Sequence, residues 1–312
     1  MTLPMIAASV FAPAKINLCL HVTGQRADGY HLLDTLVAFA NVGDHLHIQI
    51  GNTISVTTEG PEANGVPADM DNLVLQVASF FKEMPGASFL LDKRLPVSSG
   101  IGGGSADAAA AFRGLMAHWS DGVVDPVLYD ADRSPMGRGL LELGADIPMC
   151  LQSTTVRAEG IGDVLTPVSI PSLIAVLVNP RVSVATPSVF SALEYKANEA
   201  LPETLPSFQG PYQLIDWLSE QRNDLQEPAC RLFPEIAEAL KVLDHTKGCL
   251  LSRMSGSGAT CFGIYETATQ AKNAEKALRD AQPEWWVVSV VLGNQSEHAL
   301  PRIKRSNTAA FS

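Results

Sequence analysis

Cysteine is scarce in this sequence and never occurs in a paired spacing. The 312 residues contain no C-x-x-C pair, and the five cysteines are Cys19, Cys150, Cys230, Cys249 and Cys261. An odd number of widely separated thiols is typical of a reducing compartment, in which they stay unpaired and mostly buried. The pattern argues against a disulfide framework and predicts a cytoplasmic protein.

Long hydrophobic runs and a basic surface are also missing. No apolar run approaches the roughly eighteen residues of a membrane span, and the first charged residue is Lys15, so a basic signal-peptide start is absent. The net charge is -11 and the pI is near 5.1. Because nucleic-acid surfaces need clustered Lys and Arg, we expect small-molecule partners, with no nucleic acid and no membrane. A homodimer is left open.

The remaining composition is that of a globular chain, since 46% of its residues are hydrophobic and its length suffices for two domains. Apolar periodicity predicts strands and helices that interleave without strict alternation or repeats. We therefore predict an α+β fold with domains at 1–168 and 169–312. Strands are expected at 10–22, 35–40, 45–50, 87–95, 154–159 and 173–178, and helices at 71–84, 211–220, 234–243 and 268–281. The polar ending, 296–312, is expected to be loose.

One segment, residues 95–111, reads L-P-V-S-S-G-I-G-G-G-S-A-D-A-A-A-A. Its glycines let the backbone approach a ligand, and the alanine-rich helix that follows offers unpaired N–H groups to an anion. Ser105 lies where the N-cap of that helix is expected. A flexible linker would not explain why the glycines stop where strong helix formers begin. We predict a phosphate-binding loop.

Two better known glycine loops fit this segment less well. A P-loop needs Gly-Lys followed by Ser or Thr, and no lysine here follows a glycine. A Rossmann fingerprint needs a second strand about twenty residues on, whereas W-S-D-G-V-V-D-P at 119–126 reads as a turn. Dinucleotide binding remains a weak alternative.

Three separated segments together resemble the signature motifs of the GHMP kinase superfamily: A-P-A-K-I-N-L at 12–18, the glycine loop, and S-G-S-G-A at 255–259. The resemblance spans nearly the whole chain. It implies a two-domain fold with the active site in the cleft between the domains, and ATP as phosphoryl donor. The ATP-binding residues it implies are Pro96, Val97, Ser98, Ser99, Gly100, Ile101, Gly102, Gly103, Gly104, Ser105 and Ala106.

Further motifs are similar to one branch of that superfamily. They are G-Q-R-A-D-G-Y-H at 24–31, L-G-A-D-I-P at 143–148, A-E-G-I-G-D at 158–163 and R-N-D-L at 222–225. The G-Y-H element discriminates best among them. This branch phosphorylates the 2-hydroxyl of a cytidine-diphosphate-linked methylerythritol in the non-mevalonate isoprenoid pathway, and the resemblance implies that substrate.

The resemblance also assigns two catalytic residues. Asp146 would orient the acceptor hydroxyl and accept its proton, while Lys15 would stabilise the Asp146 carboxylate and neutralise developing charge. Taken singly, a strand lysine is more often a solvated charge and an aspartate after a glycine a turn residue. Lys15 and Asn17 share one face of the predicted strand, directed away from the core.

For the substrate, the resemblance implies an aromatic pocket. Tyr30 and His31 match positions that bind cytosine, and Phe190 matches the ring that closes the other face. Thr186 would stand near the diphosphate or nucleoside, and Asn17 near the methylerythritol. The alternative is that the turn before Tyr30 merely leaves packed rings.

Magnesium is implied as the companion of ATP, although the sequence names no carboxylate ligand for it, and we assign no metal residue. His45 and His47 share a strand face and fit a solvated position better than a metal site. Ser98 and Ser99 stand where many relatives have glycine or alanine. Asp107 stands where some have asparagine; we expect it in the first helical turn, facing away from ATP.

Two rival functions remain open. One is a GHMP kinase for another alcohol, such as homoserine or a shikimate-like compound. The other is a catalytically silent nucleotide-binding regulator, against which the presence of both Lys15 and Asp146 argues.

Overall fold

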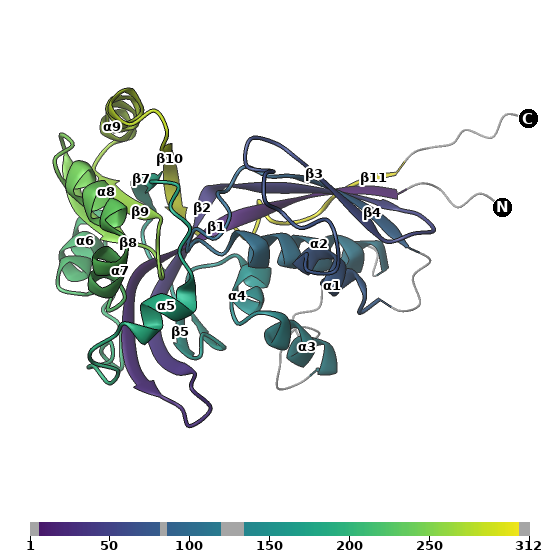
Figure 1. Ribbon diagram of the computed structural model, residues 1–312, viewed down its shortest axis with the longest axis horizontal. Helices are drawn as coiled ribbons and strands as arrows, with labels where there is room; N and C mark the ends of the chain where they lie inside the picture. The colour runs from purple at the N-terminus through teal and green to yellow at the C-terminus, as the bar shows by residue number, and fades with distance from the viewer. Residues whose placement is uncertain (1–5, 82–85, 120–133, 306–312) are drawn as a thin grey trace, which may run out of the picture.

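The computed structural model describes residues 6–81, 86–119 and 134–305 (Figure 1). Two long antiparallel strands, β1 (Ile6–Gln25) and β2 (His31–Ile50), run through both halves of the molecule. In the turn between them Arg26 N donates to Tyr30 O, and Gly29 has a φ of 95°, a value that favours glycine. All the other strands attach to this pair, directly or through a neighbour.

The first half of the sheet is covered by helices α1 to α4, which lie on one side of its strands in Figure 1. α2 packs along β1 with buried alanines, and a Cβ at Gly114 would lie 2.2 Å from Ile48 Cδ1, so helix and sheet approach closely. The elements of this half are β3 (Ser55–Glu59), α1 (Leu73–Ala78), β4 (Ala87–Asp92), α2 (Gly103–Trp119), α3 (Pro135–Leu143), α4 (Ile147–Gln152), β5 (Val156–Gly160) and β6 (Val164–Pro167).

The second half continues the sheet in the order β2-β10-β7-β9-β8, with antiparallel neighbours. Helix α9 begins with a capping box in which Thr267 and Gln270 satisfy each other's backbone N–H groups. The elements are β7 (Leu173–Asn179), α5 (Thr186–Ser191), α6 (Pro211–Ser219), α7 (Gln226–Leu232), α8 (Pro234–Asp244), β8 (Cys249–Met254), β9 (Cys261–Tyr265), α9 (Ala268–Ala281) and β10 (Trp286–Gly293). The last strand, β11 (Arg302–Arg305), returns to the first half, where it pairs with the start of β1 (Figure 1).

The mixed helix and strand content confirms the predicted α+β class, and most predicted elements are found within a few residues of their expected ends. Three expectations about element limits are wrong, and the start of α2 adds a fourth. The helix expected at 71–84 covers 73–78, because Asn72 caps its start; residues 82–85 lie outside the described part. The predicted strands at 35–40 and 45–50 are one strand, β2. The ending is not loose throughout, because β11 pairs with β1.

The helix after the glycine loop starts earlier than expected. α2 begins at Gly103, so Ser105 lies inside its first turn and is not the N-cap, and Asp107 is beyond that turn. Of the turn expected at 119–126, residues 120–126 lie outside the described part. The predicted domain boundary at 168/169 falls between β6 and β7 and stays a prediction. Among the described helices, none is long and apolar enough to cross a membrane.

Candidate functional site

The glycine loop, which joins β4 to α2, lines a cavity of about 710 Å³. Gly100 and Gly102 have φ values of 73° and 67°, which only glycine adopts without strain, and Ser98 takes the same left-handed region at 52°. Nine of the eleven predicted ATP-binding residues line this cavity. The side chains of Ile101 and Ala106 are instead fully buried in the apolar cores.

The second glycine turn, at 255–259, packs directly against the glycine loop. Ser255 Oγ donates to Gly100 O over 3.2 Å, and Thr260 N donates to Ser99 O over 3.1 Å. A Cβ on Gly100 would lie 2.5 Å from Gly258 O, so the two turns are in direct backbone contact. The predicted role of this turn in steadying the phosphate loop therefore has a physical basis.

Lys15 and Asp146 are joined beside the loop. Lys15 Nζ lies 3.0 Å from Asp146 Oδ2 and donates to Asn17 Oδ1 over 3.0 Å. Asp146 is the N-cap of α4, but its side chain makes no capping hydrogen bond, so its carboxylate is available to Lys15 and remains 36% exposed. A buried ammonium thus holds a carboxylate that a ligand can reach.

Lys15 and Asn17 share one face, as predicted, but that face is covered. The two residues are 6% and 3% exposed, because Lys15 N donates to Ile101 O and Asn17 N donates to Ser255 Oγ, which closes the glycine turns over them. The side-chain amide nitrogen of Asn17 donates to Thr35 Oγ1, while its oxygen accepts from Lys15. Asn17 lines neither the cavity of the glycine loop nor the second cavity, which is described next.

A second cavity, of about 630 Å³, contains the predicted substrate residues Tyr30, His31, Thr186 and Phe190. The rings of His31 and Phe190 are stacked, with centroids 4.7 Å apart, while Tyr30 is 60% exposed at the mouth. Burial, and secondarily the charge of Lys196, lower the pKa of His31. Its Nε2 is buried without a hydrogen-bond partner among the described residues, an unsatisfied polar atom beside the stacked rings.

The two cavities meet at Asp146. Both are lined by Ser105, Asp146, Thr186 and Phe190, and Thr186 Oγ1 is hydrogen-bonded to Ser257 Oγ at 2.9 Å. A group bound against the glycine loop and a group bound among the aromatic rings would therefore face each other across one carboxylate. This is the arrangement that transfer of a group between two ligands requires.

The structure contains a buried ionic network beside the glycine loop that the sequence did not predict. Lys93 Nζ donates to Asp44 Oδ2 over 2.5 Å and to Asp107 Oδ2 over 2.8 Å, and Asp44 Oδ1 accepts from the backbone N–H groups of Arg94 and Leu95. Asp107 lines the first cavity, so the expectation that it faces away is wrong. The reason is that Lys93 attracts its carboxylate inward. The only local signal was the charged pair Lys93–Arg94 directly before the loop.

The glycine loop, the supporting turn and the shared carboxylate define a GHMP-type small-molecule kinase, which uses ATP as donor, and comparisons agree. The family model "GHMP kinases N terminal domain" matches residues 72–164, and "GHMP kinases C terminal" matches residues 198–284. A homoserine kinase from Cytophaga hutchinsonii shares the fold, with a TM-score of 0.64 at 18% identity over 96% of this chain and 97% of that one.

More similar proteins identify the branch. The 4-diphosphocytidyl-2-C-methyl-D-erythritol kinase of Roseobacter denitrificans is 51% identical over 97% of this chain and 99% of its own length. That of Ruegeria pomeroyi is 49% identical over 90% and 98%. A crystal structure of 4-(cytidine 5'-diphospho)-2C-methyl-D-erythritol kinase superposes with a TM-score of 0.72 at 32% identity, covering 91% of this chain and 99% of that one. The chain belongs to the 4-diphosphocytidyl-2-C-methyl-D-erythritol kinase family.

Proposed function

We propose that this chain transfers the γ-phosphoryl group of ATP to the 2-hydroxyl of 4-diphosphocytidyl-2-C-methyl-D-erythritol, a step of the non-mevalonate route to isoprenoid precursors. The observation that carries the proposal is Asp146 at the junction of the two cavities, paired with Lys15 at 3.0 Å. ATP would occupy the cavity of the glycine loop and the cytidine substrate the aromatic cavity.

The roles of the two residues follow from this geometry. Asp146 would accept the proton of the acceptor hydroxyl as the new oxygen–phosphorus bond forms and the bond from the γ-phosphorus to the departing ADP breaks. Lys15, held by Asn17 and by its own backbone bond to Ile101, would keep the carboxylate oriented and offset negative charge near the acceptor. Because Lys15 is only 7% exposed in its side chain, solvent screens that charge little.

The backbone N–H groups of the glycine loop would hold the phosphates of ATP. Magnesium is proposed as the companion ion. The carboxylates that line the glycine-loop cavity are those of Asp71, Asp107 and Asp146. Asp107 and Asp146 are already paired with lysines, which fits an ion held mainly by the phosphates themselves. Such an ion neutralises charge on the transferred group.

One assay tests the function: purified protein with ATP, magnesium and the cytidyl substrate, followed by ADP release. Lys15→Ala and Asp146→Asn should each lower kcat by about a hundredfold or more while nucleotide binding is retained. A folded, ATP-binding wild-type chain without turnover would contradict the proposal, and the silent regulator would then be favoured. Turnover of homoserine in preference to the cytidyl compound would favour the other kinase rival.

Three further statements are proposals of the same kind. The five cysteines are all free, which supports a reducing, cytoplasmic location. Domains 1–168 and 169–312 are testable by limited proteolysis near 168. A homodimer remains a prediction, which sedimentation equilibrium of the purified chain tests.

A further inference from the structure

The aromatic cavity contains one cationic side chain among the described residues that line it, Lys196. Its Nζ lies 3.3 Å from Gln25 Oε1, which is a neutral partner. The nearby Arg26, by contrast, is paired with the Asp28 carboxylate at 2.7 Å. The charge of Lys196 also reaches the cavity, since it contributes, after burial, to the lowered pKa of His31. Among the described residues no carboxylate is paired with Lys196, which therefore places positive charge beside the aromatic rings.

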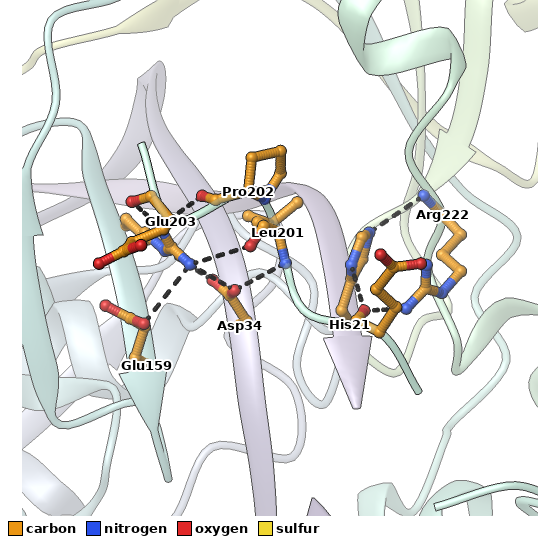
Figure 2. A network of polar contacts seen from close by, with 9 residues as sticks. His21, Asp34, Glu159, Leu201, Pro202, Glu203 and Arg222 are labelled. Atoms are coloured by element: carbon orange, nitrogen blue, oxygen red, sulfur yellow. Dashed lines mark hydrogen bonds and ion pairs between the residues drawn. The ribbon is translucent and has the colours of Figure 1, made fainter. Parts of the chain in front are cut away.

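The chain that follows Lys196 is fixed to the sheet, as Figure 2 shows. We refer to residues 198–203 as the anchored segment. At its start, Asn198 N donates to Val22 O over 2.9 Å, and Glu199 O is the hydrogen-bond partner of His21 Nδ1 and Arg222. These contacts hold the first part of the segment against β1, directly after Lys196.

The far end of the anchored segment is held by a buried ion pair. Arg157 and Asp34 form two hydrogen bonds, of 2.9 and 2.7 Å, and Asp34 Oδ2 also accepts from Leu201 N over 2.8 Å. Arg157 donates in turn to Pro202 O and Glu203 O (Figure 2). Because both ends are fixed to β1, β2 and β5, the backbone next to Lys196 has a defined place beside the cavity.

We propose that Lys196 binds the diphosphate of the cytidine substrate and so selects for it. This inference rests on the function proposed above. A diphosphate in a protein with a net charge of -11 needs a local cation, and the other lysines of the site are engaged: Lys15 with Asp146, and Lys93 with two aspartates. An ammonium meeting a phosphate oxygen makes a charge-assisted hydrogen bond. The competing interpretation is a solvated surface lysine with no ligand.

Binding of CDP and of cytidine, measured by isothermal titration calorimetry, separates the two interpretations. Lys196→Gln should raise the Kd for CDP by about three- to tenfold, the range of an exposed charge-assisted contact, and leave that for cytidine within about twofold. Lys247→Gln, which removes the same charge from an exposed position outside the site, should change neither value. Lys196→Arg should retain most of the CDP affinity, because the charge is kept.

Several results would overturn the inference: equal losses for CDP and cytidine, an unchanged CDP affinity in Lys196→Gln, or no CDP binding by the wild-type chain. In turnover assays Lys196→Gln should raise KM for the cytidyl substrate and leave kcat unchanged, and a fall in kcat alone would contradict a binding role. The calorimetry needs no turnover. A wild-type chain that binds CDP through Lys196 but makes no ADP would therefore reject the proposed reaction and keep this contact.

Discussion

The Lys93 ammonium donates to the Asp107 carboxylate over 2.8 Å and joins the strand before the glycine loop to the helix after it. Asp44 completes the link, because it accepts from Lys93 and from two backbone N–H groups at the start of the loop. All three charged side chains are at most 5% exposed. The glycine loop is thereby tied at both ends to a buried ionic network.

Replacing Lys93 should therefore be among the most damaging changes in the chain. Lys93→Met leaves the buried carboxyl groups of Asp44 and Asp107 without their common partner, and the free energy of unfolding should fall by about 3–5 kcal/mol. Urea unfolding followed by circular dichroism measures it. Lys247→Met, an exposed lysine, is the control and should change stability by less than about 0.5 kcal/mol. Equal free energies of unfolding for the two variants would show that the network does not stabilise the fold.

Asp107 should make stability depend on pH. Burial raises its pKa to about 8; Lys93 opposes this shift and Asp44 adds to it. A carboxyl whose folded pKa lies above its unfolded value contributes stability that is present below the unfolded pKa, near 3.8, and is lost as pH rises through about 8. Asp107→Asn, which cannot ionise, should flatten this loss. Unfolding curves at pH 6 to 9 measure it, and parallel pH profiles of variant and wild type would contradict the assignment.

A methyl group at Gly100 should displace the phosphate loop. Gly100→Ala would place Cβ 2.5 Å from Gly258 O in a left-handed conformation, at a cost of about 1–3 kcal/mol. We expect KM for ATP to rise by about tenfold with CDP affinity unchanged. Gly51→Ala is the matched control, since a Cβ there meets nothing within 4 Å. An unchanged KM for ATP in Gly100→Ala would show that the loop does not need its contact with the second turn.

The ion pair that anchors residues 198–203 should tolerate little change. Arg157→Lys loses the two-point contact with Asp34 together with the bonds to Pro202 O and Glu203 O, and should lower the free energy of unfolding by about 2–4 kcal/mol. Because Lys196 lies just before this segment, CDP affinity should fall too. Arg231→Lys alters an exposed ion pair, in which the Arg231 side chain is 42% exposed and that of Glu194 65%, and should have little effect on stability or CDP affinity. If Arg157→Lys unfolds with the same free energy as the wild type, the Arg157–Asp34 pair does not hold residues 198–203 in place.

The sequence predicted those parts of the site that depend on local pattern. The glycine run predicted a phosphate-binding loop because backbone conformation there is set by residue type, and the resemblance of L-G-A-D-I-P at 143–148 to a kinase motif pointed to Asp146. Lys93 and Arg157 could not be found in this way, because their partners Asp44 and Asp34 are 49 and 123 residues away in the chain. The inward direction of Asp107 follows from the same long-range pairing.

Ser105 shows a different limit. Its residue type favours a helix cap, but the preceding glycines fold into the helix because α2 is packed closely against β1, and tertiary packing outweighs the capping preference. In the same way, alternation in the sequence revealed segments of β1 and β2 but not that each continues for 20 residues. Length of that kind is set by partners on both sides of the strand.

The continuity of β1 and β2 limits how far the two halves of the protein can move relative to each other. Domain closure elsewhere uses a few loop residues as a hinge between rigid bodies. Here the same two hydrogen-bonded strands cross from one half to the other, so swinging the halves apart would shear a ladder of backbone bonds along its length. We therefore expect ligands to enter and leave through movement of the turns that line the cavities, while the β1–β2 ladder that carries Lys15 stays in place. The pairing of Lys15 with Asp146 is thus set by the fold before any ligand binds.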